Sequence, residues 1–354
     1  MASSNLNKAK FEKFDEFYTR FEDIEREVEA YIDYNPNVFQ GKTVLLPCDD
    51  PEWSNFTRYF AQNFQRLGLR KLVSTSYALE SKKFKEGYPL TLFESDAPQF
   101  DESKSKTHGK IFVLTKDIDG DGRIDLDDLE WQYLEGDGDF RSPELRQLRD
   151  EADIIVTNPP FSLSREFFSW VMEKNKKFLL IVNVLFLTNK DIFPLIKNNK
   201  VWRGYGFQNG NSFFRTPTAR DYANGVYDES TGYVKFRNCC WITNMEHGRR
   251  HKPLVLMTMA DNIKYSKHAS IKGIGYSYYD NYNAIEVPYI DSIPADFEGI
   301  MGVPATFLDK YCPEQFEIVG NEIDLKIPKG RGYVNGKRKT SRIFIRKIKG
   351  NENS

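Results

Sequence analysis

The order of apolar and polar positions along the chain predicts strands that alternate with helices. Runs rich in apolar residues, typical of buried strands, lie at 43–46, 71–76, 153–157, 178–187 and 238–243. Apolar residues recur at helical spacing over 55–67 and around 167–172, which predicts helices, and Gly68 ends the first of them. Strands that alternate with helices form parallel βαβ units, so we expect an α/β fold with a Rossmann-like, doubly wound and mostly parallel sheet.

The same pattern divides the chain into parts. Apolar and aromatic residues at helical spacing over 11–34, followed by Pro36, predict a long first helix. A strand at 111–114 belongs to an insertion between core elements. The expected parts are a disordered leader at 1–10, a main domain at 11–250 with an acidic hairpin inserted at about 80–135, and a smaller second region at 251–354.

The composition fits a globular protein without a membrane span. The chain has 354 residues, 40% of them hydrophobic, and no stretch approaches the ~18 consecutive apolar residues that a membrane helix needs. The first residues contain no apolar signal core, so we expect a cytoplasmic protein. The four cysteines lack a metal-type spacing, which favours a reducing compartment, and the four histidines are scattered, which argues against a histidine metal site.

Positive charge gathers near the C-terminus, although the formal net charge is only −1. The stretch from Lys326 to Lys349 contains many lysines and arginines and no acidic residue, which is typical of a surface that binds a phosphate backbone. A solvated basic tail has the same composition, but the alternation over 342–346 favours an ordered strand. The basic cluster at 247–252 and the tyrosines at 276–282 suit contacts with phosphates and unstacked bases, so together these segments predict a DNA cleft.

The most specific chemical signal is Asn158-Pro159-Pro160-Phe161, which directly follows the strand predicted at 153–157. Neither proline has an N–H and both fix φ near −65°, so the chain leaves the sheet stiffly. The amide oxygen of Asn158 and the carbonyl of Pro159 can converge on one exocyclic amine, whose two hydrogens need two acceptors. Phe161 offers a flat face to an aromatic ring. The motif therefore predicts a substrate with an amino group on a planar heterocycle, such as N6 of adenine.

Several segments of the chain resemble the EcoRI-type adenine-specific DNA methyltransferase family. Besides Asn-Pro-Pro-Phe after a strand, the resemblance rests on 15–19, on 48–51 followed by 54–56, and on 138–141. It implies that 11–250 is a catalytic domain that uses S-adenosylmethionine, and that 251–354 recognises a target in double-stranded DNA. It also implies a restriction-modification or epigenetic system, with a cognate restriction endonuclease as a partner.

The resemblance also implies roles for individual residues. The expected catalytic residues, which would hold a flipped-out adenine for direct methyl transfer, are Asn158, Pro159, Pro160 and Phe161. The expected cofactor-binding residues are Phe17, Tyr18, Thr19, Cys48, Asp49, Asp50, Asn55, Ser76, Asp139, Phe140 and Asn158. The expected DNA-binding residues are Arg249, Arg250, Lys337, Arg338, Lys339 and Arg342.

Several of these assignments have structural alternatives. Residues 17–19 also fit one face of a helix. The aspartates after the first strand could cap the helix that follows, and Asp139 could cap a glycine turn.

An acidic segment resembles a calcium-binding loop. The expected ligands of Ca²⁺ or another divalent ion are Asp117, Asp119, Asp121, Arg123 and Asp128, with Gly122 at the sixth position. The twelfth position holds Asp128, where a bidentate Glu is usual, and no amphipathic helix precedes the loop. The alternative is an acidic hairpin whose Asp and Gly residues make turns.

Two other functions stay open from the sequence. The motif at 158–161 would also hold an adenine in RNA or the side-chain amide of a protein glutamine, although the basic C-terminal segment favours DNA. The other alternative is a calcium-dependent DNA-binding module without catalysis. Binding of S-adenosylmethionine would distinguish an enzyme from such a module.

Overall fold

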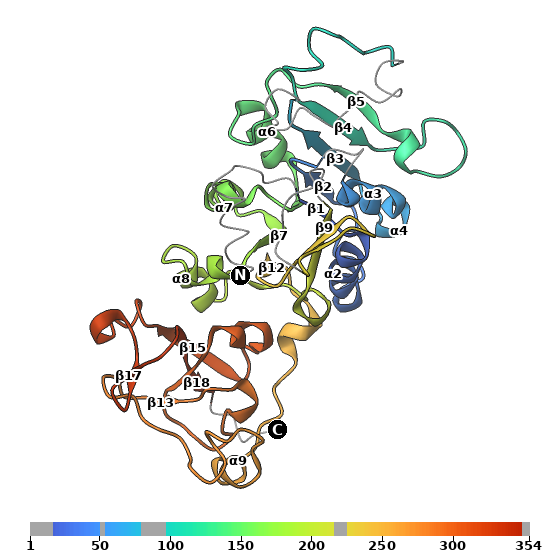
Figure 1. Cartoon of the computed structure of the whole chain (residues 1–354). Coiled ribbons are helices and arrows are strands. Elements are labelled where there is room, and N and C mark those ends of the chain that lie inside the picture. The colour runs from blue at the N-terminus through green and yellow to red at the C-terminus, as the bar shows by residue number, and fades with distance from the viewer. Residues whose placement is uncertain (1–16, 50–53, 79–96, 216–224, 349–354) are drawn as a thin grey trace. The chain divides into compact units, whose positions relative to one another are not determined.

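A computed structural model describes residues 17–49, 54–78, 97–215 and 225–348 and shows two compact units (Figure 1). The first unit consists of Met1–Val184 and Gly204–Glu246, and the second of Leu185–Arg203 and His247–Ser354. The segment Leu185–Arg203, which we expected in the main domain, thus groups with the C-terminal region. The reason is its packing, because α8 (Phe193–Lys197) contacts β15 (Phe316–Asn321) and Lys197 forms an ion pair of 2.8 Å with Asp324.

The first unit is built on a mixed, mostly parallel sheet. In spatial order its strands are β5 (Glu130–Tyr133), β4 (Lys110–Leu114), β3 (Lys71–Ser76), β2 (Thr43–Leu46), β6 (Ile154–Thr157), β7 (Lys177–Asn183) and β12 (Cys239–Thr243). The central strands β3, β2, β6 and β7 are parallel, whereas β4, β5 and β12 run antiparallel to their neighbours. Every residue of β2 and β6 is buried, as expected for strands covered on both faces. The expected α/β fold with a mostly parallel sheet is confirmed.

The helices of the first unit begin and end at recognisable signals. They are α2 (Phe21–Tyr34), α3 (Asn55–Gln62), α4 (Phe64–Leu67), α6 (Pro143–Glu151) and α7 (Ser164–Met172). Figure 1 shows α3 and α4 on one face of the sheet and α6 and α7 on the other. Ser54 caps α3 by accepting a hydrogen bond of 3.1 Å from the amide of Phe56, and α4 ends at Gly68 with φ of 62°. The single helix predicted over 55–67 is divided at Asn63, whose backbone is not helical.

The helix predicted over 11–34 begins only at Phe21 within the described residues. Tyr18–Thr19 instead form β1, which pairs antiparallel with β9 (Ser212–Arg215). This second sheet continues through β11 (Tyr233–Phe236) to β10 (Tyr227–Asp228). Phe17 packs against Phe214 and Phe236, with ring centroids 6.0 Å and 5.3 Å apart, so pairing with a distant strand overrides the helical spacing. Residues 11–16 lie outside the described ranges.

The second unit has a sheet and a core of its own. Its strands in spatial order are β13 (Ile285–Glu286), β14 (Met301–Pro304), β18 (Arg342–Lys347) and β15. A separate hairpin pairs β16 (Tyr333–Val334) with β17 (Lys337–Arg338), and the remaining elements include β8 (Trp202–Arg203) and α9 (Met259–Tyr265). Ile343, Phe344 and Ile345 are fully buried, so the strand predicted over 342–346 is confirmed. None of the helices in the described ranges is long and apolar enough to cross a bilayer.

Candidate active site

Three loops come together at the carboxyl ends of the parallel strands. β2 leads into 47–49, β3 into Tyr77, and β6 into Asn158. Thr157 Oγ1 donates a hydrogen bond of 2.8 Å to the carbonyl of Pro47, and the amide of Cys48 donates one of 3.4 Å to Thr75 Oγ1. These bonds tie the loops to one another at the edge where open α/β sheets bind ligands.

Asn158 is held by one side of its amide group. Its Nδ2 donates a hydrogen bond of 2.7 Å to the carbonyl of Phe17, which fixes the orientation of the amide because that carbonyl can only accept. Its Oδ1 is buried, and no group in the described ranges donates to it. A buried acceptor without a donor costs about 1–3 kcal/mol, so its presence here indicates a place for a ligand that brings hydrogen-bond donors.

The backbone after Asn158 follows the stiff path that the prolines predict. Pro159 is buried, and none of the described residues donates a hydrogen bond to its carbonyl. The carbonyl of Pro160 is occupied, because it accepts a hydrogen bond of 2.9 Å from the amide of Leu163. The open acceptors at this corner are therefore Oδ1 of Asn158 and the carbonyl of Pro159.

Phe161 closes one side of this corner with its ring. The side chain is 9% exposed, and its ring centroid lies 5.9 Å from that of Phe17 and 6.4 Å from that of Phe214. The ring meets Phe214 edge to face, at an interplanar angle of 87°. Phe161 is thus fixed by an aromatic cluster, which holds the orientation of the face that we expected to receive the base.

The segment 17–19 lies beside both Asn158 and α3. The carbonyl of Phe17 accepts from Asn158, and the carbonyl of Thr19 accepts a hydrogen bond of 2.8 Å from Nδ2 of Asn55. The structure therefore brings together three parts of the expected cofactor site that are far apart in the sequence. The helix-face interpretation of 17–19 is wrong within the described residues, because this segment is extended.

Asp49 is a buried carboxylate at the end of β2. Its Oδ1 accepts a hydrogen bond of 2.9 Å from Ser54 Oγ, and its main-chain carbonyl accepts from the hydroxyls of Thr57 and Ser74. The residue that caps α3 is Ser54. Asp49 therefore does not cap this helix, which was the structural alternative that we considered for it. Cys48, directly before it, has φ of 68°, which turns the chain sharply at the strand end. Asp50 lies outside the described residues.

Asp139 and Phe140 follow a glycine turn that touches β3. Gly138 has φ of 86°, and a Cβ at this position would overlap the carbonyl oxygen of Ser76. Arg141 Nη2 pairs with Oδ2 of Asp139 at 2.6 Å, and this guanidinium lowers the pKa of the Asp139 carboxyl. Phe140 is buried with its ring 5.1 Å from that of Phe167, so its ring supports the turn from inside the core.

Tyr77 is a residue of this site that the sequence pattern does not single out. Burial, together with the neighbouring Cys48 and Asp139, raises the pKa of its hydroxyl. Its position directly after β3 would have been a signal for it, because side chains at strand ends face the ligand edge of such a sheet.

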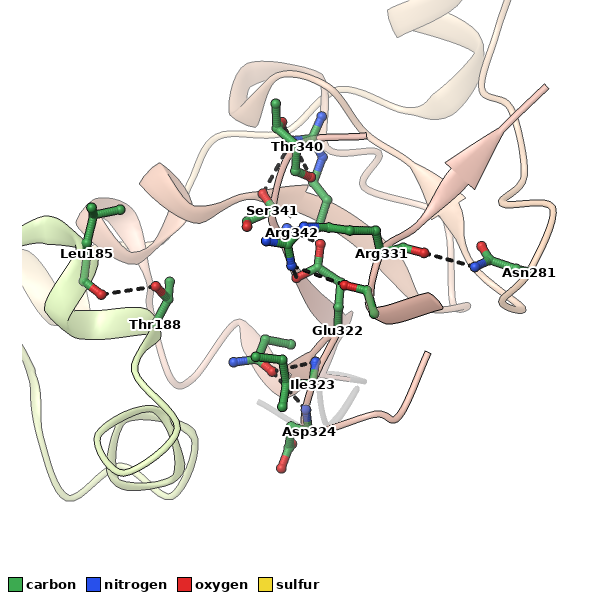
Figure 2. Close-up of polar contacts among 12 residues, drawn as sticks. Leu185, Thr188, Asn281, Glu322, Ile323, Asp324, Arg331, Thr340, Ser341 and Arg342 are labelled. Atoms are coloured by element: carbon green, nitrogen blue, oxygen red, sulfur yellow. Dashed lines mark hydrogen bonds and ion pairs between the residues drawn. The ribbon is translucent and has the colours of Figure 1, made fainter. Parts of the chain in front are cut away.

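The residues expected to bind DNA fall into two groups. Arg250 is buried, with its guanidinium 4.0 Å from the ring centroid of Trp202, and Arg342 is buried against Glu286, with 2.5 Å between Nη2 and Oε1. Figure 2 shows Arg342 surrounded by Thr340, Ser341 and Glu322 of the same unit. These two arginines therefore stabilise the second unit from within. Arg249 is partly exposed, Lys339 is half-buried, and Lys337 and Arg338 are exposed.

The acidic loop is organised by its own backbone. Asp117 Oδ1 accepts a hydrogen bond of 2.6 Å from the amide of Gly120, and Asp128 accepts from the amides of Ile118, Asp119 and Asp125. Carboxylate oxygens of Asp117, Asp119 and Asp128 lie within 4.8 Å of one another. Asp121 Oδ1 accepts from the amide of Arg123 at 2.7 Å, and Asp125 caps the 3-10 helix Leu126–Asp128. The hydrogen bonds are those of the alternative interpretation, in which Asp and Gly residues make turns.

Comparisons with known proteins match nearly the whole chain. The family described as "Adenine-specific methyltransferase EcoRI" matches residues 5–352. The type II methyltransferase M.EcoRI of Escherichia coli is 40% identical over 349 residues, which cover 96% of this chain and 95% of the relative. The type II methyltransferases M.MgeORF184P of Mycoplasma genitalium and M.MpnI of Mycoplasma pneumoniae are each 32% identical, over 97% and 89% of this chain and 98% and 84% of their own lengths. No solved structure gives a significant match.

Proposed function

Because the chain belongs to the EcoRI-type family of adenine-specific methyltransferases, and is therefore a DNA adenine methyltransferase, we propose that Asn158 and Pro159 hold the target adenine by its N6 amine. The observation that carries this proposal is the buried Oδ1 of Asn158, which accepts no hydrogen bond from the described residues while Nδ2 of the same amide is fixed by Phe17. An amine with two hydrogens fits the two open acceptors at this corner.

The two acceptors would activate the amine as well as hold it. When both N6 hydrogens point at Asn158 Oδ1 and the Pro159 carbonyl, the nitrogen lone pair leaves conjugation with the ring and becomes nucleophilic. The adenine reaches this corner only after it is flipped out of the duplex, and Phe161 then lies beside it. Catalysis in this mechanism consists of positioning and electrostatics, without a covalent enzyme intermediate.

The cofactor end of the site lies at β2 and β3. The family implies S-adenosylmethionine, which supplies a methyl group on a positively charged sulfonium. The buried Asp49 and the ionised Asp139 fit such a ligand, because they offer carboxylates for its ammonium, ribose or amino groups. Asn55 and Asn158 hold the 17–19 segment by its carbonyls, so we propose that this segment covers the methionine part.

Double-stranded DNA is the proposed partner. Lys337 and Lys339, together with Arg249, would neutralise phosphates on either side of Arg338, so affinity should fall with salt. The relatives are named type II methyltransferases, and we propose a cognate restriction endonuclease that reads the same site. We propose the cytoplasm as the compartment, since the DNA to be modified lies there.

Sequencing of genomic DNA from cells that express the protein tests the function. The expected result is N6-methyladenine at one short sequence motif, absent from cells without the gene. An unmodified genome would contradict the proposal. The acidic loop has no part in this mechanism, so added Ca²⁺ or a chelator should leave the modification unchanged.

Asn158→Ala tests the mechanism. The variant should lose at least about 10²–10³-fold in kcat, because an acceptor aimed at the reacting amine is gone. Its affinity for duplex DNA should stay within a few-fold of wild type, as a gel-shift titration would show. Full activity in Asn158→Ala would refute the role given to this residue.

A further inference from the structure

A short hairpin carries much of the uncompensated positive charge in the basic C-terminal segment. Within that segment, Arg342 pairs with Glu286, and Arg346 lies 3.6 Å from Glu317. The side chains of Lys337, Arg338 and Lys339 have no carboxylate partner among the described residues. Lys337 and Arg338 form β17 and are exposed, so their charges point to a polyanionic partner.

The tip of the hairpin is a tight turn held by one carboxylate. Asn335 and Gly336 have φ of 50° and 71°, as in the two-residue turns that match the twist of paired strands. Asp280 Oδ1 accepts a hydrogen bond of 3.0 Å from the amide of Asn335, and its Oδ2 accepts one of 2.8 Å from the amide of Gly336. The turn is therefore fixed before any ligand binds.

The base of the hairpin is fixed by the neighbouring residue. Asn281 accepts a hydrogen bond of 3.1 Å from the amide of Tyr333. It also donates one of 2.9 Å to the carbonyl of Arg331, and Figure 2 shows this second bond. Gly332 lies directly on the buried ring of Tyr279, where a Cβ would overlap the ring. Tyr279 belongs to the tyrosine segment that we expected to contact bases, and its buried ring supports the base of the hairpin instead.

The strand register decides which basic side chain faces outward. Tyr333 is opposite Arg338, and Val334 is opposite Lys337. Val334 is buried in the core beside Phe344, so Tyr333 and Arg338 share the face that points away from that core. Lys329 Nζ lies 5.4 Å from the ring centroid of Tyr333 and adds a cation to this outward face.

We propose that the β16–β17 hairpin enters the major groove of the target duplex and that Arg338 reads a guanine there. The major groove admits a two-stranded ribbon, and an arginine fork bonds O6 and N7 of guanine in a way that no other base pair matches. Asp280 and Asn281 are positioning residues, because they hold the ribbon and touch no DNA. This inference rests on the proposed function, since it names the residue that selects the methylated site.

Arg338→Lys is the sharpest test, because it keeps the charge and removes the fork. The probes are a duplex with the motif found by genomic sequencing and a set of duplexes in which each base pair of that motif is replaced in turn. We expect the variant to lose roughly ten- to a hundred-fold of its discrimination at one G·C pair, in binding and in methylation, with an unchanged salt dependence. Arg346→Lys, the same change at another exposed arginine of the unit, is the matched control and should discriminate as wild type does.

Asp280→Ala separates positioning from charge. Removing a carboxylate beside the hairpin raises the positive charge, so a purely electrostatic role predicts tighter binding to every duplex. Positioning predicts the opposite for the cognate duplex, namely weaker binding and weaker discrimination.

Two results would overturn the inference while the proposed function stands. One is a wild-type protein that methylates a motif and an Arg338→Lys variant that keeps full discrimination at every pair. The other is tighter cognate binding by Asp280→Ala. Absence of any methylated motif in wild-type cells would instead refute the proposed function itself.

Discussion

Asn158 and Asp139 are each prepared by a neighbouring group before a ligand binds. For Asn158 the orientation of the amide is fixed, and for Asp139 the charge of the carboxylate is stabilised. The amide of Asn158 cannot rotate without placing its oxygen against the carbonyl of Phe17, so its acceptor stays directed at the corner. The guanidinium of Arg141 lowers the pKa of the Asp139 carboxyl, so its charge persists to a lower pH. Both residues depend on a neighbour that takes no part in the transfer.

Arg141→Gln should shift the pH dependence of cofactor binding. Arg141 lowers the pKa of Asp139 from its usual value of 3.8, so in wild type the charge persists as the pH falls and is lost only below that value. In the variant the pKa of Asp139 should rise, and the loss of affinity for S-adenosylmethionine should begin at a higher pH. Calorimetric titrations from about pH 3 to pH 6 would measure this, because the wild-type transition lies below the usual value.

The exposed Arg146 of α6 provides the control for that experiment. Arg146→Gln should leave the pH profile unchanged. If the Arg141→Gln profile coincides with the wild-type profile, Asp139 has no charged role at the cofactor.

At the scale of elements, the loop that contains Gly138 packs so closely on the end of β3 that no side chain fits at this position. The turn at Gly138 lies against the end of β3, which sets the position of Asp139 relative to Tyr77. Gly136, two residues earlier, has nothing within 4 Å of where its Cβ would be. The two glycines of one loop therefore differ in what a methyl group would meet.

Gly138→Ala should destabilise the first unit by about 1–3 kcal/mol, because its positive φ strains any other residue and the new methyl group would meet Ser76. Gly136→Ala should change the free energy of unfolding by less than about 0.5 kcal/mol. Urea denaturation of both variants measures the difference. Equal stability in the two would show that the contact between the turn and β3 is not tight.

The sequence predicts a structural feature well when neighbouring residues determine that feature. It does not predict a feature that depends on residues far along the chain. Apolar runs place β2, β3 and β6, and the residues 158–161 after β6 are readable because two prolines restrict the chain by themselves. The strand β1 is hidden, because its partner β9 lies far along the chain and its aromatic residues fit helical spacing equally well. Burial of Arg342 is hidden for the same reason, since only the fold brings Glu286 to it.

At the scale of the whole molecule, each unit holds its own core, and we propose that each carries its own part of the function. Aromatic and aliphatic residues of the first unit form one core, and Tyr279, Val334 and Phe344 belong to a separate core in the second. The buried pair of Arg342 and Glu286 joins β18 to β13 within the second unit. Damage to that pair should therefore affect DNA recognition more than cofactor binding.

Arg342→Met should destabilise the second unit by about 3–5 kcal/mol, because it leaves Glu286 buried without its cation. Binding of S-adenosylmethionine should persist in this variant, whereas DNA affinity should fall. Adding Glu286→Leu should restore most of the stability, since no charge is then stranded. Thermal unfolding measures the stability of the variants, and titrations with S-adenosylmethionine and with DNA measure the two affinities. Equal losses of cofactor binding and DNA binding in Arg342→Met would contradict the independence of the two units.

The segment Leu185–Arg203 belongs to the second unit, which limits how the target specificity that we propose for this unit can be exchanged between relatives. A chimera made with one crossover near His247 would join a foreign β15 to a resident α8 and lose the match between Lys197 and Asp324. A transplant has to carry both pieces, with three junctions: one at each end of Leu185–Arg203 and one at the start of His247–Ser354. Recombination in nature faces the same constraint, so new specificities in this family should arise more readily by point changes within the module than by shuffling it.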